Sequence, residues 1–183
     1  MKAVLFCGGK GRRMFPFSTY RPKCLLPIGN IPLLKHWLIA LQEMRIEETI
    51  LICDPVEARQ FRGLTEEFPF SRIVSAENRQ IWEALENLCS EQPVLLANGD
   101  GFLSVLDLKR LLSSYEEKGN SILLNQIEDF RSTECICADV QDKVVSLYGH
   151  PRAHYVNAQS CGVAIVDNSV LRYLHTTQYG FHK

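Results

Sequence analysis

The hydrophobic pattern changes period repeatedly along the first two thirds of the chain. Short continuous apolar runs, typical of buried strands, occupy Lys2–Cys7, Thr49–Cys53, Arg72–Val74, Val94–Ala97 and Ser121–Asn125. Between them, apolar residues recur every three or four positions, which predicts helices that open at Pro32 and Asp54 and cover residues 81–89 and 106–117. Strands that alternate with helices predict a three-layer α/β sandwich whose mostly parallel sheet is covered on both faces.

The second helix has the clearest start signal. Asp54, Pro55, Val56 and Glu57 would place a capping side chain, a proline in the first turn and an acid two residues later. We therefore expect this helix to begin directly after the strand that ends at Cys53.

From Glu134 onward the pattern changes to closely spaced strands. They are expected at Cys135–Val140, Val144–Leu147 and Val156–Val166, with a hairpin turn at Asp142-Lys143. A helix follows over Asn168–His175, with Asn168 or Asp167 as its cap. No linker composition divides the chain, so we expect a single domain, residues 1–183, with a β-rich portion near its end.

Composition and charge narrow the function classes. The 183 residues are 46% hydrophobic and carry a formal charge of -1, so no basic field favours nucleic acid as a partner. No apolar run reaches the roughly 18 residues of a membrane span. The seven cysteines form no C-x-x-C pair, and no signal peptide is recognisable at the N-terminus. A reducing cytoplasm is the expected compartment.

The loop after the first strand carries the candidate chemistry. Its sequence, GGKGRR from Gly8 to Arg13, fits neither the dinucleotide fingerprint nor the P-loop. What remains is a glycine turn whose backbone N–H groups can face phosphate oxygens, with Arg13 and Lys23 adding positive charge. The alternative is a tight surface turn with solvated cations.

The longer string GGKGRRMFPFSTYRPKCLLP resembles the signature of the sugar-phosphate nucleotidyltransferases. The residues in register are Gly8, Gly9, Gly11, Arg13, Pro16, Pro22, Lys23, Leu25 and Pro27. Downstream, Asn98-Gly99-Asp100 is similar to the N-G-D that ends a strand in this family. Val156-Asn157-Ala158 followed by Gly162-Val163 is similar to the segment that lines the sugar pocket, provided that Gln159–Cys161 is an insertion.

This resemblance implies a Rossmann-like fold and a reaction in which a sugar-1-phosphate attacks the α-phosphorus of an NTP, giving an NDP-sugar and pyrophosphate. It implies Arg13 and Lys23 as the catalytic cations and Asp100 as a ligand of Mg²⁺. It further implies a nucleotide site at Gly8, Gly9, Lys10, Gly11 and Gln80, and a sugar site at Asn157, Gly162 and His150. The family's enzymes are often oligomers, so a homo-oligomer is expected too.

Several positions depart from the family pattern. Gln80-Ile81-Trp82 has no glycine where family members let backbone approach the base, and His150 stands where they have a lysine. The family's second metal-binding aspartate would lie beyond Lys183, and Asp107 and Asp139 are poor substitutes. The resemblance thus implies a single domain that lacks the family's C-terminal part, either as a fragment of a longer protein or as a chain that works with Asp100 and another carboxylate. Two further readings therefore stay open: a catalytically silent binding or regulatory module, and a transferase for a smaller acceptor such as an alcohol phosphate.

Overall fold

The computed structural model describes residues 1–9, 11–75, 85, 92–126, 135–148 and 156–177. The chain divides into two compact units. Unit 1 combines Met1–Ser121 with Ala164–Lys183, and unit 2 is Ile122–Val163.

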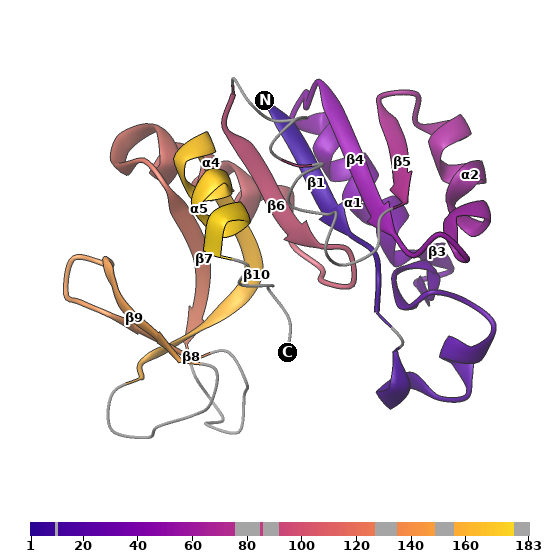
Figure 1. Ribbon diagram of the computed structural model, residues 1–183, viewed down its shortest axis with the longest axis horizontal. Helices are drawn as coiled ribbons and strands as arrows, with labels where there is room; N and C mark the ends of the chain where they lie inside the picture. The colour runs from indigo at the N-terminus through magenta and orange to yellow at the C-terminus, as the bar shows by residue number, and fades with distance from the viewer. Residues whose placement is uncertain (10, 76–84, 86–91, 127–134, 149–155, 178–183) are drawn as a thin grey trace. The chain divides into compact units, whose positions relative to one another are not determined.

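Unit 1 is built on parallel strands. In spatial order they are β5 (Ser71–Ser75), β4 (Glu48–Cys53), β1 (Lys2–Phe6) and β6 (Val94–Asn98). The central strand β1 is in register with both neighbours, so that Phe6 lies beside Ile52 of β4 and Asn98 of β6. The predicted parallel sheet is confirmed, and all four strands end at one edge (Figure 1).

Helices flank this sheet and supply the rest of the core. They are α1 (Leu33–Glu43), α2 (Ala58–Glu67), α4 (Val105–Lys118) and α5 (Asn168–Thr177). Val4, Ile50 and Leu96 from three strands form one buried cluster with Leu171 of α5. These side chains are at most 4% exposed, as expected for strands that are covered by helices.

The start of α2 differs from the prediction. The helix begins at Ala58, and residues 54–57 form a turn in which the Asp54 carboxylate accepts a hydrogen bond from the Val56 N–H at 3.0 Å. An aspartate bonded to the backbone two residues on stabilises such a turn, which competes with the helix for these residues. The helix expected at residues 81–89 lies outside the described residues except for Leu85, which is helical and fully buried.

Side chains cap the starts of α4 and α5, whereas α1 begins after Pro32 without a side-chain cap. Ser104 Oγ accepts a hydrogen bond from the Asp107 N–H at 3.1 Å at the start of α4. Asp167 caps α5 by accepting from the Ser169 N–H at 2.9 Å, which selects one of the two predicted caps. The hydrogen bond from the Ser169 side chain is the main reason that the pKa of Asp167 lies below its usual value.

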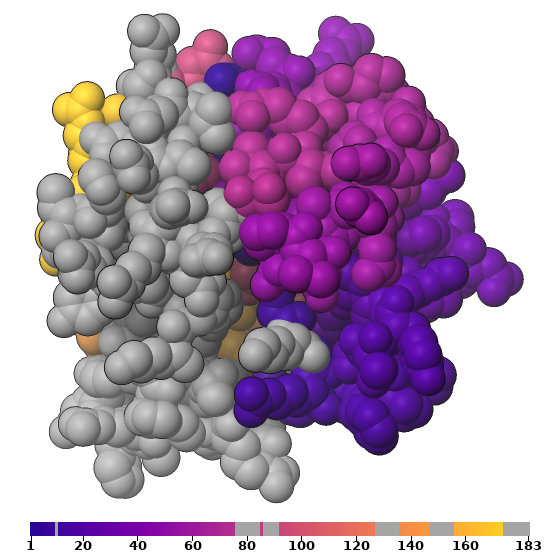
Figure 2. Space-filling model, turned by 45° about the vertical axis from the view of Figure 1, so that its right-hand side comes forward, coloured from indigo at the N-terminus to yellow at the C-terminus, as the bar shows by residue number. Residues whose placement is uncertain are grey.

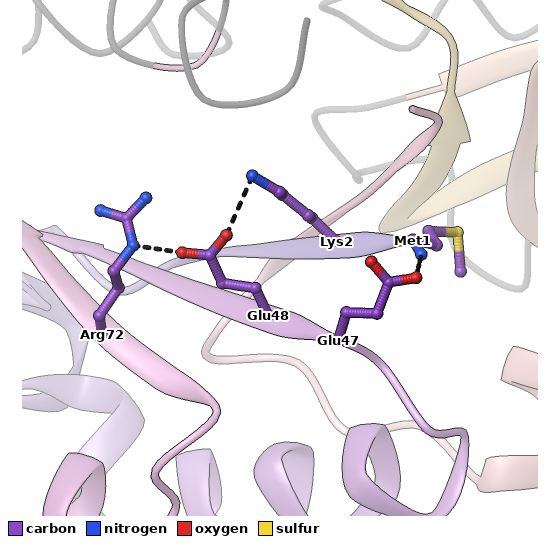
Figure 3. Close-up of polar contacts among 5 residues, drawn as sticks. All are labelled: Met1, Lys2, Glu47, Glu48 and Arg72. Atoms are coloured by element: carbon purple, nitrogen blue, oxygen red, sulfur yellow. Dashed lines mark hydrogen bonds and ion pairs between the residues drawn. The ribbon is translucent and has the colours of Figure 1, made fainter. Parts of the chain in front are cut away.

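The opposite edge of the sheet, where the strands begin, is tied by ion pairs (Figure 3). Glu48 lies between Lys2, whose Nζ is 3.0 Å away, and the Arg72 guanidinium, so one carboxylate connects three neighbouring strands. The hydrogen bond from Arg72 lowers the pKa of Glu48. These pairs fasten the strands at the edge away from the glycine loop.

Unit 2 is antiparallel and contains the predicted β-rich portion. Its strands are β7 (Ser121–Gln126), β8 (Cys135–Ala138), β9 (Val144–Tyr148) and β10 (Ala158–Val166). The first residue of β7 and the end of β10, from Ala164 onward, belong to unit 1. β8 pairs with β9 and β10. The predicted hairpin turn is confirmed, with Asp142 at φ 60°. Over the described part of the chain, no helix combines the length and apolarity needed to cross a membrane.

Candidate active site

The candidate site lies where β1 and β6 end side by side. The Gly99 N–H donates to the carbonyl of Phe6 at 2.9 Å, which holds the segment after β6 against the segment after β1. A Cβ at Gly99 would lie 2.9 Å from Cys7 Sγ and 3.2 Å from the Phe6 oxygen. Any larger residue at this position would force its neighbours to shift, and the close approach that glycine permits brings Asp100 next to the glycine loop.

The glycine loop leaves β1 in conformations that suit glycine. Gly9 has φ 119° and Gly11 has φ 52°, and a Cβ at Gly11 would lie 2.9 Å from Ser18 Cβ. The short 3₁₀ helix η1 (Arg12–Met14) follows and exposes Arg13. In Figure 2 the N-terminal segment, in indigo, stands at the surface of unit 1. Lys10 lies outside the described residues.

Two of the predicted functional residues meet in an ion pair. Lys23 Nζ donates a hydrogen bond to Asp100 Oδ2, although the two residues are 77 positions apart. Their side chains are 38% and 36% exposed, so both charges remain open to solvent and to a ligand. A Cβ at Gly11 would lie 3.9 Å from Lys23 Cβ. The loop, the lysine and the aspartate therefore form one site.

Buried neighbours fix the position of Lys23. It opens the 3₁₀ helix η3 (Lys23–Leu25), in which Cys24 is 1% and Leu25 is 8% exposed. The Cys24 thiol donates a weak hydrogen bond to the Cys7 carbonyl at 3.6 Å. The segment that carries Lys23 is thus anchored directly beneath the start of the glycine loop.

The thiol of Cys7, at the start of the loop, is inert. A hydrogen bond with the Cys24 side chain, together with burial, raises the pKa of the Cys7 thiol well above its ordinary value, and the charge of Asp100 acts in the same direction. Cys7 therefore stays protonated at neutral pH and does not act as a nucleophile. The solvent-exposed pair of Lys23 and Asp100 therefore remains as the candidate for chemistry at this site.

The donor set fits a metal that is shared with phosphates better than a closed protein cage. Within the part of the chain that the structure describes, no group of three or more His, Cys, Asp or Glu side chains could hold a metal ion. Asp107 is used at the start of α4, and Asp139 accepts hydrogen bonds from the Gln141 and Lys143 N–H groups in the β8–β9 turn. Asp100 remains as an exposed carboxylate, and Mg²⁺ is commonly held by one or two carboxylates plus substrate phosphates.

The residues expected to bind sugar belong to unit 2. The Asn157 side chain donates to the Ala138 carbonyl at 2.8 Å and accepts from the Ala138 N–H at 2.9 Å, so the amide fastens β8. Gly162 has φ 70°, a conformation that favours glycine. Gln80 and His150 lie outside the described residues.

One residue near the site was not expected to have a role there. Trp37 is one of the apolar residues whose spacing is typical of the helix α1, yet its indole N–H donates to the Gly101 carbonyl at 2.7 Å, one residue past Asp100. A buried indole usually finds a hydrogen-bond acceptor, and this was the only sign of the contact in the sequence.

Several known proteins with similar sequences are sugar-phosphate nucleotidyltransferases by name. A D-glycero-alpha-D-manno-heptose 1-phosphate guanylyltransferase of Campylobacter jejuni is 28% identical over 80% of this chain and 67% of its own length. A mannose-1-phosphate guanylyltransferase of Mycobacterium tuberculosis is 29% identical over 79% of this chain. The chain spans less than half of several such relatives, 42% in the latter case.

The fold has a counterpart among solved structures. A putative glucose-1-phosphate thymidylyltransferase from Bacillus anthracis superimposes with a TM-score of 0.80, covering 95% of this chain and 74% of its own, at 20% identity. The predicted Rossmann-like fold and the family resemblance are both confirmed. Residues 3–168 match the family model described as the MobA-like NTP transferase domain, and the chain belongs to that family.

Proposed function

We propose that the protein joins a sugar-1-phosphate to an NTP, releasing pyrophosphate and forming an NDP-sugar. The observation that carries this proposal is the Lys23–Asp100 pair beside the glycine loop. A cation, a carboxylate and a turn of backbone N–H groups at the carboxyl edge of a parallel sheet are the groups needed to bring two polyanions together. The names of the relatives give the same reaction class.

In the proposed reaction, a phosphate oxygen of the sugar-1-phosphate attacks the α-phosphorus while the bond to pyrophosphate breaks. Gly8, Gly9, Lys10 and Gly11 cradle the triphosphate. Arg13 stabilises the charge that develops on the leaving pyrophosphate, and Lys23 moves from Asp100 to the α-phosphate and the incoming phosphate. Positioning and charge stabilisation supply most of the acceleration, with little need for a general base.

Asp100 would hold Mg²⁺, which neutralises phosphate oxygens when it is bound. We further propose that residues 1–183 act as one nucleotidyltransferase domain, that Gln80 contacts the nucleotide, and that Asn157, Gly162 and His150 contact the sugar.

A homo-oligomer is part of the same proposal. Free thiols at Cys7, Cys24 and Cys53 suit a reducing cytoplasm, which we propose as the compartment.

A specific observation favours a second candidate function. Both polar atoms of the Asn157 side chain are occupied by the backbone of Ala138, so the amide has to release this strand before it can contact a sugar. A silent module that binds nucleotide without transferring it would keep the loop, Lys23 and Asp100 but would not need Asn157 for a sugar.

A thermal-shift panel separates these functions. The purified chain is heated with Mg²⁺ and each of GTP, ATP, CTP, UTP and dTTP, and pyrophosphate release is then followed with a series of sugar-1-phosphates. A nucleotide present at about one hundred times its dissociation constant stabilises the fold by roughly 2.7 kcal/mol, which is measurable. Selective stabilisation with pyrophosphate release is the expected result.

The other outcomes are equally clear. Stabilisation without pyrophosphate release, across all sugar-1-phosphates, identifies the silent module. No stabilisation by any nucleotide contradicts both functions, because each of them requires the glycine loop to bind a triphosphate.

A further inference from the structure

Helix α1 holds the turn that follows β6 through two adjacent side chains. The Trp37 indole N–H donates to the Gly101 carbonyl at 2.7 Å. The His36 ring packs edge-on against Phe102, with centroids 5.5 Å apart and planes at 81°. Both contacts fall on the two residues directly after Asp100.

The indole is itself rigidly placed. Trp37 is 3% exposed, and its neighbours in the helix, Leu34, Leu38 and Leu41, are completely buried. Close packing fixes the rotamer of such a side chain, so the direction of its N–H is fixed as well. The indole N–H is therefore a fixed hydrogen-bond donor that can hold the turn in place.

Asp100 needs this support because of its sequence neighbours. It lies between Gly99 and Gly101, and glycine gives a backbone more conformational freedom than any other residue. On one side, the bond from the Gly99 N–H to Phe6 restricts the chain. On the other side, Gly101 is held by its N–H, which donates to the Asn98 carbonyl at 3.1 Å, and by its carbonyl, which accepts from Trp37.

The same helix also supports the segment that carries Lys23. The Leu33 N–H donates to the Leu26 carbonyl at 3.0 Å, one residue past η3, and a ring nitrogen of His36 lies 3.0 Å from the Ile28 carbonyl. Helix α1 is therefore a common base for the two segments whose side chains form the ion pair.

We propose that Trp37 is a positioning residue for Asp100: its hydrogen bond to Gly101 holds the flexible Gly-Asp-Gly turn so that the carboxylate is preorganised for a divalent cation. This inference rests on the proposed function, in which Asp100 is the metal ligand. Trp37 touches neither substrate nor metal in this role. It acts through the backbone of the residue that follows the ligand.

The test compares Trp37→Phe with the parent in a titration of the full chain with Mn²⁺ alone, followed by the electron paramagnetic resonance of the free ion. Phenylalanine keeps an aromatic ring in the core and removes the donor. Loss of one hydrogen bond to a ligand-bearing turn should weaken Mn²⁺ binding about threefold to tenfold. Asp100→Asn defines the complete loss of the site.

A matched control separates positioning from stability. Phe61→Leu in α2 removes part of another fully buried ring, so it lowers the melting temperature, and it should bind Mn²⁺ like the parent. Hydrogen exchange of residues 99–102 adds a readout without metal, and it should be faster in Trp37→Phe and unchanged in Phe61→Leu.

Parental Mn²⁺ affinity in Trp37→Phe, or parental exchange at residues 99–102, would overturn the inference. In that case the metal assignment would survive as long as Asp100→Asn lost binding. Equal Mn²⁺ binding by Asp100→Asn and the parent would refute the assignment of Asp100 and the inference with it.

Discussion

Lys23 and Asp100 neutralise each other in the ligand-free protein, and their exposure determines how easily they part. An ion pair that is more than one third exposed on both sides contributes only about 0 to 1 kcal/mol. A triphosphate and a divalent cation can therefore take over the lysine and the carboxylate at little cost. The pair keeps both side chains at the site without making them unavailable.

Arg13 differs from this pair because it lies exposed on η1, where no ion pair is found for it among the described residues. If it stabilises charge on the leaving pyrophosphate, Arg13→Ala should lower kcat by about 10²- to 10³-fold. The melting temperature should not change, because truncation of an exposed side chain removes no packing. Steady-state pyrophosphate release and a thermal melt measure the two effects.

The adjacent exposed arginine is a natural control. Arg12→Ala removes the same charge one position before the arginine that is in register with the family signature, and it should stay within a few-fold of parental turnover. Arg13→Ala with the turnover of the parent would remove Arg13 from the catalytic groups.

At the scale of elements, the regular strands and helices of unit 1 could be predicted because their hydrophobic periods are strong. The predicted run Val94–Ala97, for example, is the strand β6, Val94–Asn98. The 3₁₀ helices and the short hairpin of β2 (Pro27–Ile28) and β3 (Ile31–Pro32) could not be predicted, since elements of two or three residues have no period. These irregular pieces carry Arg13 and Lys23, so the least predictable elements hold the candidate catalytic groups.

The contact between the ends of β1 and β6 gives a prediction about an element junction. Gly99→Ala should destabilise unit 1 by about 1 to 3 kcal/mol, because its Cβ would meet Cys7 Sγ at 2.9 Å and the Phe6 oxygen at 3.2 Å. Urea unfolding of the variant and the parent measures the difference.

Two further variants test whether the contact with Cys7 causes this loss of stability. Gly63→Ala lies in α2 with open space around the new Cβ and should be neutral or stabilising by up to about 1 kcal/mol, as expected for alanine in a helix. Adding Cys7→Ala to Gly99→Ala removes the clashing sulfur, so the double variant should lose less than the sum of the two single losses. Strict additivity would show that the sulfur contact is not the source of the strain.

At the scale of the whole molecule, the resemblance supplies candidate site residues, but it does not predict their contacts. The signature marked Lys23 and Asp100 as candidate functional residues, and nothing in the sequence between these two residues, which are 77 positions apart, indicated that they pair. That contact depends on β1 and β6 being neighbours in register. The cluster of thiols below the loop was equally hidden, because Cys7, Cys24 and Cys53 come from three separate segments.

Those thiols make the stability of unit 1 sensitive to alkali. Burial is the main cause that raises the pKa of Cys53 from its ordinary value of 9.0 to about 11, and the charges of Glu57 and Asp54 add to it. Between these two pKa values the folded state keeps a proton that the unfolded chain loses. The contribution of the Cys53 thiol to the free energy of unfolding is therefore complete below pH 9 and is lost as the pH rises to about 11. A shift of this size corresponds to at most about 3 kcal/mol.

We therefore expect the free energy of unfolding, measured with urea at several pH values, to fall steeply between about pH 9 and pH 11. Cys53→Ala loses some stability at every pH through the cavity that it leaves, yet its alkaline slope should be shallower because one titrating group is gone. The slope is the diagnostic quantity, since a cavity shifts the curve without tilting it. Parallel curves for the parent and Cys53→Ala would mean that the Cys53 thiol ionises equally readily in the folded and unfolded chain.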